Sequence, residues 1–275
     1  LIDMGGIRKN SLQAKVLYAL EKFMYERAEK IIVLLPYAKE YTVSRGISTE
    51  KIFWLPNGVN LDRFDHPSPL DPESEVAKAF ERYRDRFKVV YIGAHGVPNG
   101  LDIILEAAKF IQDKNADIHF IMVGEGAEKG RLVNKARDLE ITNITFCEPV
   151  PKQAVPTVLR SSDCLVFSIP SFDIYRYGVS LNKSFDYLAS AKPVVMAGNP
   201  RNNIVKEANC GIAVEPENPE ALADAIIEIY NMPEEKRKEL GMNGRRYVEQ
   251  HHSTKILAEK LEALLGWNSN TGSGL

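Results

Sequence analysis

The sequence predicts an α/β protein built on a doubly wound parallel sheet, with a partial second α/β domain before it. From Phe87 onward, short apolar segments alternate with amphipathic ones over most of the chain. The apolar segments are nearly continuous, as in strands that are covered by helices on both faces. With 275 residues, of which 44% are hydrophobic, the chain can bury one large core or two smaller ones.

The first 64 residues contain elements for only half a sheet. We expect a helix over residues 11–30, strands over residues 30–35 and 51–55, and a further helix after Pro36. The apolar positions of the first helix form one stripe, which consists of Leu12, Val16, Leu20, Phe23 and Met24. No predicted element upstream is available to cover this stripe, so we expect the first domain to be incomplete.

Residues 65–77 are rich in Pro, Ser, Asp and Glu, a composition typical of a linker. Beyond it, strands are predicted over residues 88–93, 117–123, 144–147, 164–168, 194–196 and 211–214. The helices between them are expected to begin near Leu101, Glu128, Gln153, Asn182, Asn202 and Pro219. After Glu234 the pattern is helical. These boundaries divide the chain into residues 1–64, residues 65–250, and a carboxy-terminal helix and tail over residues 251–275.

The overall charge and the cysteines restrict the classes of function. A net charge of −2 gives no general attraction to nucleic acid, so no nucleic-acid partner is expected. Cys147, Cys164 and Cys210 are odd in number and lie in or beside apolar segments, which favours buried thiols in a reducing compartment. No apolar segment reaches the roughly 20 residues that span a bilayer, and no signal peptide is recognisable. A cytoplasmic protein is therefore predicted.

Residues 163–195 are the most informative stretch of the chain. A predicted strand over residues 164–168 is followed by a long loop and by a helix that begins near Asn182. The amino terminus of a helix at the carboxyl edge of a parallel sheet favours an anion such as a diphosphate. Lys183 and Asp186 can share one face of this helix, the first beside a phosphate and the second on the hydroxyls of a ribose. An exposed ion pair on the helix surface would have the same spacing, so the spacing alone does not distinguish the two.

The run of residues 182–189, closed by residues 191–195, resembles the donor-site signature of retaining, family 4 glycosyltransferases of the GT-B fold. It is most similar to the branch that transfers amino sugars in the synthesis of bacterial surface polysaccharides. The family signature carries two glutamates. Asp186 stands at the second, whose carboxylate holds the ribose hydroxyls in the family, and Gly178 stands at the first. The remaining differences from the signature are Leu181, Ser184 and Ala191.

The resemblance implies that residues 65–250 form a Rossmann-like domain that binds a nucleotide-sugar donor, with UDP as the expected nucleotide. Residues 1–64 resemble the end of the amino-terminal, acceptor-binding domain, of which roughly a hundred or more residues would be missing. The implied acceptor is a saccharide or a lipid-linked saccharide at the inner face of the cytoplasmic membrane, which allows peripheral association with that membrane. No cluster of ligand residues is evident, so no metal and no cofactor is expected. The fragment alone is expected to bind donor weakly and not to turn over.

Three turns that follow predicted strands would meet at the same edge of the sheet and could surround one ligand. The residues of these turns that we expect to bind the nucleotide-sugar are Gly93, His95, Gly96, Asn99, Gly124, Glu125 and Val150. Glycines allow the backbone to approach a phosphate closely, and His95 could supply a charge or a neutral hydrogen bond there. A tight turn without a ligand would explain the glycines equally well, and Glu125 would serve equally as a helix cap.

The loop before the predicted phosphate-binding helix supplies the remaining candidates, Arg176, Gly178 and Val179. Arg176 is the best-placed cation for a sugar-diphosphate leaving group, whereas the alternative is a mobile surface loop without a ligand. Together these residues predict a glycosyltransferase in which Lys183 and Asp186 are catalytic. The alternatives are a non-catalytic nucleotide-binding module and a sugar-nucleotide epimerase of similar fold.

Overall fold

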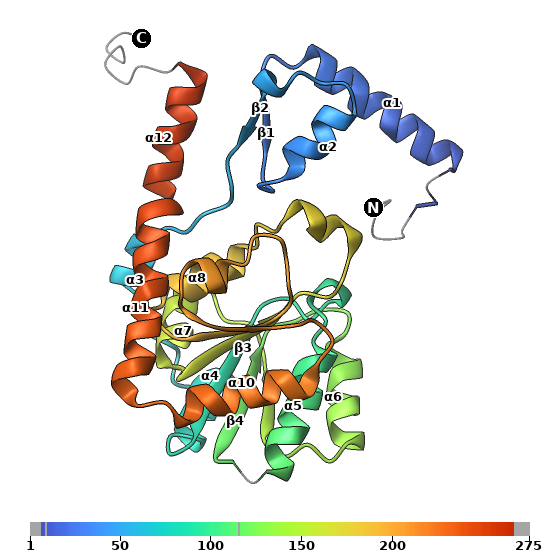
Figure 1. Cartoon of the computed structure of the whole chain (residues 1–275). Helices are drawn as coiled ribbons and strands as arrows, with labels where there is room; N and C mark the ends of the chain where they lie inside the picture. Colours follow the sequence, from blue (N-terminus) through green and yellow to red (C-terminus); the bar gives the residue numbers. More distant parts are fainter. Residues whose placement is uncertain (1–6, 9, 115, 267–275) are drawn as a thin grey trace.

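The computed structural model describes residues 7–8, 10–114 and 116–266 (Figure 1). The strands are β1 Ile31–Val33, β2 Ile52–Trp54, β3 Phe87–Ile92, β4 Ile118–Val123, β5 Ile144–Cys147, β6 Cys164–Ser168, β7 Val194–Ala197 and β8 Gly211–Val214. The α-helices are α1 Leu12–Arg27, α2 Ala38–Ser44, α3 Asp62–Asp65, α4 Glu75–Arg82, α5 Asp102–Asp113, α6 Lys129–Asp138, α7 Val155–Ser161, α8 Asn182–Ala189, α9 Ile204–Glu207, α10 Pro219–Asn231, α11 Glu234–His251 and α12 Thr254–Leu265. In this part of the chain, no helix combines the length and the apolar composition needed to cross a bilayer.

These elements form two units of unequal size. The small unit contains α1, β1, α2 and β2, and the large unit contains β3 to β8 and the helices around them. Figure 1 shows the small unit above the large one, with α11 and α12 running along one side of the molecule towards it. Residues 1–6 of the expected amino-terminal remnant and residues 267–275 of the expected tail lie outside the described residues.

The large unit is a doubly wound parallel sheet, which confirms the predicted fold class. Its strands are all parallel and lie in the order β5-β4-β3-β6-β7-β8. The order reverses between β3 and β6, and ligands of such sheets bind at this reversal, outside the carboxyl ends of the strands. α5 packs against α10 on one face of the sheet, and α8 packs against α11 on the other (Figure 1).

The strands are apolar without alternation because both faces of the sheet are covered. Every residue of β4, β6 and β7 is buried. β3 and β4 pair in register from Phe87 with Ile118 to Ile92 with Val123. All three cysteines are free and buried, as the sequence predicted. Each strand of this sheet was predicted to within one residue at either end.

The sequence analysis did not predict α4. Residues 75–77 of the expected linker, which was residues 65–77, belong to this helix, so the predicted end of the linker is wrong. Ser74 caps the helix, because its hydroxyl accepts a hydrogen bond of 3.2 Å from the amide of Ala77. The helix then buries Val76 and Ala79 against the large unit. A few apolar residues within a polar composition were enough to dock this helix.

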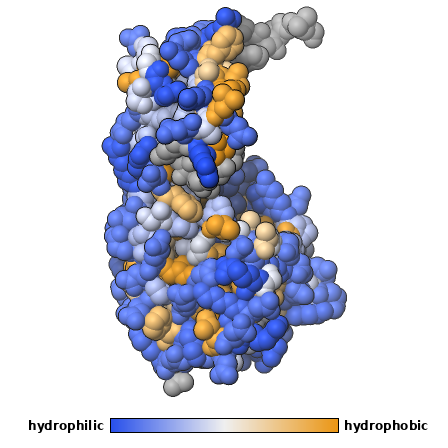
Figure 2. Space-filling view, turned by 90° about the vertical axis from the view of Figure 1, so that its right-hand side faces the viewer, coloured by the Kyte–Doolittle hydropathy of each residue, from blue (hydrophilic) through white to orange (hydrophobic). Residues whose placement is uncertain are grey.

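The small unit leaves one helix face uncovered. β1 and β2 pair in parallel, and Ile31, Ile47 and Ile52 form a separate buried cluster. The stripe predicted on α1 is exposed: Leu12 is 78% exposed and Met24 is 61% exposed. Figure 2 shows hydrophobic side chains gathered on the upper part of the molecule, where the small unit lies.

The chain crosses between the units twice, and the two crossings lie side by side. The amide of Val59 donates to the carbonyl oxygen of His252 (2.9 Å), and the amide of Thr254 donates back to Val59 (3.0 Å). A Cβ atom at Gly58 would lie 2.4 Å from the same carbonyl of His252, so only glycine allows this close approach. The pairing fixes the position at which α12 leaves the large unit.

Candidate functional site

The start of α8 presents backbone amides at the carboxyl edge of the sheet. The residue before the helix is Leu181, whose side chain has no atom that could accept a hydrogen bond and cap the first turn. The helix follows β6 after a loop that contains a short 3₁₀ turn, Asp173–Tyr177. Uncapped amides and the positive end of the helix dipole together favour an anion at this position.

Lys183 lies in the first turn of α8, and its side chain reaches the loop after β3. Its Nζ atom donates a hydrogen bond to Oδ1 of Asn99 and lies 5.0 Å from the centre of the Tyr91 ring. Asn99 is held in turn, because its Nδ2 atom donates to the carbonyl of Ala94 (2.8 Å). Burial lowers the pKa of Lys183 to about 8. The structure thus brings together two residues that the sequence analysis placed in one site from separate segments.

Asp186 faces a different set of neighbours. Its carboxylate is half-buried, and Nη1 of Arg63 in α3 lies 4.0 Å away. Arg63 is held near the loop after β5, because its Nη2 atom donates a hydrogen bond to the carbonyl of Lys152. Burial raises the pKa of Asp186, although the positive charges of Arg63 and Lys152 oppose this shift. Lys183 and Asp186 are therefore both anchored to other segments, unlike an exposed pair on a helix surface.

The sequence analysis missed Tyr187, which fixes α8 against β3. The side chain is fully buried, and its hydroxyl bonds both the amide of Ile92 (2.8 Å) and the carbonyl of the same residue (3.2 Å). Tyr187 follows Lys183 by one helical turn. A polar aromatic residue at this spacing was the sequence feature from which this contact could have been predicted. Through this contact the helix that carries Lys183 is held to the strand that precedes the Asn99 loop.

The glycine-rich turns after β3 and β4 interlock. The amide of His95 donates to the carbonyl of Glu125 (2.8 Å), and the amide of Glu128 donates to the carbonyl of His95 (2.9 Å). A Cβ atom at Gly124 would lie 2.0 Å from the Gly93 carbonyl oxygen. Larger residues at Gly124 and Gly126 would therefore separate the two turns, and these two glycines are required by the packing whether or not a ligand binds, whereas Gly96 has room for a Cβ atom.

His95 is completely buried between these turns. Its ring lies 5.9 Å from that of Tyr91 and 6.0 Å from that of Phe146. Within the described part of the chain, neither ring nitrogen has a hydrogen-bond partner. Burial, assisted by the charge of Lys129, lowers the pKa of His95. The imidazole is therefore neutral at pH 7, and of the two roles expected for it only the neutral one is compatible with this setting.

Glu125 takes part in an ion-pair cluster at the ends of β4 and β5. Its carboxylate lies 3.1 Å from Nζ of Lys129, and the same ammonium group lies 2.6 Å from Glu148. The carboxylate also accepts a hydrogen bond of 3.2 Å from the amide of Gly126. Val150, in the turn after β5, is half-buried and packs against the main core.

The loop before α8 is anchored through Asn202. Oδ1 of Asn202 accepts from the amide of Val179 (2.7 Å), and Nδ2 donates to the carbonyl of the same residue (2.8 Å). Gly178 has φ +87° and ψ −174°, a conformation that is essentially confined to glycine. A Cβ atom at Gly178 would lie 2.5 Å from Asn202 Oδ1 and 2.8 Å from Pro36 Cγ. The position of the first family glutamate thus has no room for a side chain in this structure.

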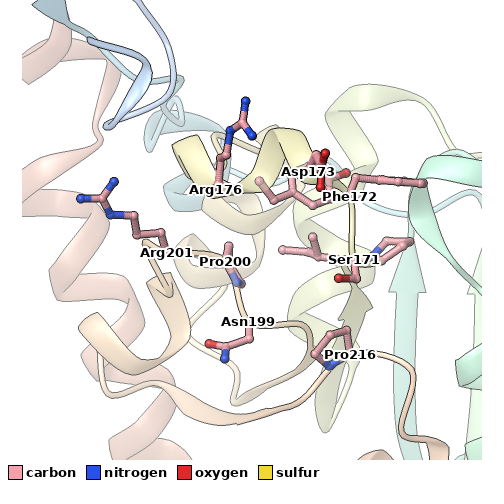
Figure 3. Close-up of a pocket in the computed structure, with 11 residues that line it drawn as sticks. Ser171, Phe172, Asp173, Arg176, Asn199, Pro200, Arg201 and Pro216 are labelled. Atoms are coloured by element: carbon pink, nitrogen blue, oxygen red, sulfur yellow. The ribbon is translucent and has the colours of Figure 1, made fainter. Parts of the chain in front are cut away.

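Arg176 lines a pocket of about 510 Å³ at the ends of β6, β7 and β8 (Figure 3). Lys183 and Asp186 are not among the residues of its wall. The guanidinium group of Arg176 lies 4.7 Å from the centre of the Tyr177 ring and donates to its hydroxyl (2.9 Å). The structure therefore places Arg176 in a pocket separate from the Lys183 and Asp186 contacts.

The family of the chain follows from its sequence. Residues 86–232 match the family model described as "Glycosyl transferases group 1", and this span covers more than half of the chain. The chain belongs to the group 1 glycosyltransferases. The matched residues contain the whole six-stranded sheet, both glycine-rich turns and α8.

Two curated relatives illustrate the range of this family. The chain is 24% identical over 259 residues to the capsular polysaccharide biosynthesis glycosyltransferase CapM of Staphylococcus aureus, covering 90% of this chain and 64% of the relative. It is 24% identical over 243 residues to the GDP-mannose-dependent monoacylated alpha-(1-6)-phosphatidylinositol monomannoside mannosyltransferase of Corynebacterium glutamicum, covering 84% of this chain and 61% of the relative. The chain therefore spans less than two thirds of the length of either relative.

Solved structures with the same fold come from several glycosyltransferases. HepE of Anabaena, crystallised with UDP-glucose, superposes with a TM-score of 0.73 at 14% identity, covering 92% of this chain and 68% of that one. TarM of S. aureus, crystallised with UDP and saccharide ligands, gives a TM-score of 0.68 at 20% identity, covering 90% of this chain and 46% of that one. These likenesses show that the group 1 glycosyltransferase described here has the GT-B-like fold that its sequence implied.

The glycosyltransferase shows no preformed metal site in the residues that the structure describes. No three of their His, Cys, Asp and Glu side chains come together as a metal ion would require. Whether the reaction uses a metal or another cofactor is a separate matter, and the expectation that it uses neither stays a prediction.

Proposed function

We propose that this glycosyltransferase transfers a sugar from a UDP-linked donor to a saccharide or lipid-linked acceptor, with retention of configuration. The observation that carries the proposal is the start of α8, which has no side-chain cap and where Lys183 reaches the Asn99 loop while Asp186 lies near Arg63. HepE was crystallised with UDP-glucose and TarM with UDP, which supports UDP as the nucleotide. The family match favours transfer over a non-catalytic nucleotide-binding module or an epimerase.

In the proposed mechanism, the diphosphate of the donor lies against the first-turn amides of α8 and the ammonium group of Lys183. Negative charge develops on the diphosphate as the bond to the sugar breaks, and fixed donors in a partly dehydrated site stabilise that charge. Asp186 accepts hydrogen bonds from the two ribose hydroxyls. Because the amides and Lys183 offset the charge, we propose that the reaction needs no metal and no cofactor.

The remaining candidates are assigned to the same ligand by their place around this edge. Gly93, Gly96, Gly124 and Glu125 belong to the interlocked turns, and His95 lies beneath them as a neutral group. We assign the base to the backbone around Val150, since this turn follows β5 and lies near the Asp186 side of α8. Gly178 and Val179 would lie against the sugar without donating to it, because the amide of Gly178 bonds Tyr175 and both backbone groups of Val179 bond Asn202.

We also propose that the chain is the donor-binding part of a larger, two-domain enzyme. Residues 65–250 are assigned to the donor domain, residues 1–64 to the end of the acceptor domain and its crossover, and residues 251–275 to a returning helix and tail. The exposed stripe on α1, the two-stranded sheet and the partial coverage of the relatives support this division. A cytoplasmic enzyme that associates peripherally with the inner face of the membrane is the corresponding expectation for the complete protein.

Calorimetric titration tests the proposed function. UDP is expected to bind this chain more tightly than GDP, and a UDP-sugar is expected to release UDP only when an extended chain and an acceptor are both present. Conversion of the donor in the absence of acceptor would show an epimerase instead. Equal rates of turnover for the 275-residue chain and for a chain extended at its amino end would contradict the proposed division.

The affinity for UDP is expected to fall as the pH rises above about 8. In the free protein the pKa of Lys183 is about 8, so the ammonium form is lost above that pH. The diphosphate is fully ionised from about pH 7 upward, so it does not contribute to the change. Binding at pH 8.5 should therefore take up a proton, which calorimetry in buffers of different ionisation enthalpy measures. A constant affinity between pH 7 and pH 9.5 would contradict the contact between Lys183 and the diphosphate.

A further inference from the structure

The 510 Å³ pocket shown in Figure 3 opens beside the proposed donor site. Its wall comes from the segments that follow β6, β7 and β8: residues 169–176, residues 199–201 and Pro216. These strands lie on one side of the reversal between β3 and β6, whereas Asn99, the partner of Lys183, follows β3 on the other side. A Cβ atom at Gly100, next to Asn99, would lie 2.7 Å from Pro170 of the wall, so the pocket adjoins the proposed donor site, although neither Lys183 nor Asp186 lines it.

The wall has the composition of a saccharide site. Phe172, Tyr175 and Pro200 supply apolar surfaces, and Ser171, Asp173 and Asn199 supply polar groups between them. Apolar rings pack against the C–H faces of a sugar, while carboxylate and amide oxygens accept from its hydroxyls. Asn199 is held in place, because its amide nitrogen donates to the carboxylate of Glu215 (3.0 Å). A small number of fixed polar groups in an apolar wall gives a ligand one orientation.

Two arginines stand at the edge of this pocket. Arg176 lies against the ring of Tyr177, at 4.7 Å, and Arg201 lies against the ring of Tyr37, at 3.6 Å. Figure 3 shows both side chains extending away from Asn199 and Pro216. Stacking on the ring of Tyr37 holds the guanidinium group of Arg201, and the N–H groups of a guanidinium group bind carboxylates and phosphates.

One of these arginines already holds a carboxylate. Nη1 of Arg201 lies 2.7 Å from Oε1 of Glu40, which belongs to α2 of the small unit. About half of each side chain is exposed, and such exposed pairs contribute little to stability. The contact shows that the position beside Arg201 accepts an oxyanion, and an anionic ligand there would compete with Glu40 for the same guanidinium group.

We propose that this pocket is the subsite for an acceptor sugar that carries a carboxylate or a phosphate. The sugar ring lies between Phe172 and Asn199, and its anionic group binds Arg201 in place of Glu40. This inference rests on the proposed function, because it states the chemical class of the acceptor for the same transfer reaction.

The test uses a pair of probes that differ in one group. Methyl glucuronide and methyl glucoside are titrated into the chain in the presence of saturating UDP. The glucuronide is expected to bind at least about fivefold more tightly than the glucoside, since only its carboxylate can form charge-assisted hydrogen bonds to arginine. Arg201→Gln is expected to weaken glucuronide binding by about tenfold. Glu40→Gln is expected to strengthen it, because the competing carboxylate is gone.

Arg201→Gln removes the cation of the ion pair between Arg201 and Glu40, and Glu40→Gln removes its carboxylate. If Arg201 and Glu40 served only to join the two units, Arg201→Gln and Glu40→Gln would change glucuronide binding in the same direction, and that result would overturn the proposal. Equal binding of the two probes, or competition between glucuronide and UDP, would also overturn it. Absence of UDP binding would instead refute the proposed donor site, and titration of the UDP-free chain with the same probes and variants would still decide the acceptor pocket.

Discussion

Replacement of Lys183 by methionine is expected to weaken UDP binding by about 10- to 100-fold, the usual range for loss of a hydrogen bond to a charged group. The ammonium group lies between Asn99 and the ring of Tyr91, and burial lowers its pKa to about 8. The folded protein therefore carries an ammonium group on Lys183 whose charge is disfavoured by burial. A bound diphosphate would offset the hydration that this group has lost. Methionine has a similar length, so the variant loses the charge without a large change in packing. Calorimetry measures the affinity.

Turnover by an extended chain is expected to fall further than UDP affinity. Loss of a fixed donor that stabilises developing negative charge typically lowers kcat by about 100- to 1,000-fold. The matched control is Lys206→Met, because Lys206 is an exposed lysine in α9, a helix that carries none of the proposed donor-site residues. The control should retain both affinity and rate. Normal UDP binding by Lys183→Met would contradict the proposed diphosphate site.

The same variant is expected to change how stability depends on pH. The pKa of Lys183 in the folded protein, about 8, lies below the value of about 10.4 for an unfolded chain. Between these two values the unfolded state binds more protons, so this residue makes the free energy of unfolding rise with pH. Below pH 8 the charged lysine disfavours the fold, and Lys183→Met removes that cost. The variant should therefore melt at the same or a higher temperature at pH 7.

Much of the large unit could be predicted from sequence because its signals are local. Strands buried on both faces appear as unbroken apolar segments, which is why the bounds of β5, β6 and β8 were predicted to the residue. The place of Lys183 and Asn99 in one site was also expected, although they belong to distant segments; their direct contact was not. In a parallel sheet the loops after neighbouring strands meet at one edge, so strand order brings them together.

Other parts of the site depend on contacts that no local pattern reveals. Arg63, the partner of Asp186, comes from a short helix in the crossover, and its position depends on how that crossover docks. His95 was expected at the diphosphate as a charge or a neutral donor, but its neutrality follows from complete burial between two turns. Arg176 was expected beside the leaving group, and the structure places it in the wall of another pocket. Side-chain direction in a long loop is set by tertiary packing, which the spacing of residues does not encode.

Replacement of Gly178 by glutamate is expected to lower the free energy of unfolding by about 2–4 kcal/mol and to leave donor affinity no higher. The substitution would install the residue that the family signature has at this position. However, the backbone at Gly178 has φ +87° and ψ −174°, and the Cβ direction is filled by Asn202 and Pro36. Asn202 also anchors Val179, so its displacement would release the loop that leads into α8. Thermal unfolding and UDP-sugar titration measure the two effects.

Gly46 supplies a control that separates backbone strain from collision. It has the same φ of +87°, but a Cβ atom there would meet no atom within 4 Å. Gly46→Ala should therefore cost only the positive φ, about 1–2 kcal/mol, whereas Gly178→Ala should cost more because its ψ of −174° is essentially confined to glycine and because Asn202 and Pro36 must also move. Equal losses of unfolding free energy for the two alanine variants would show that Asn202 and Pro36 move away from a Cβ atom at Gly178 without a measurable cost. A gain in donor affinity for Gly178→Glu would show in addition that the loop can rearrange to admit the family glutamate, and the site would then have to be described with that side chain in it.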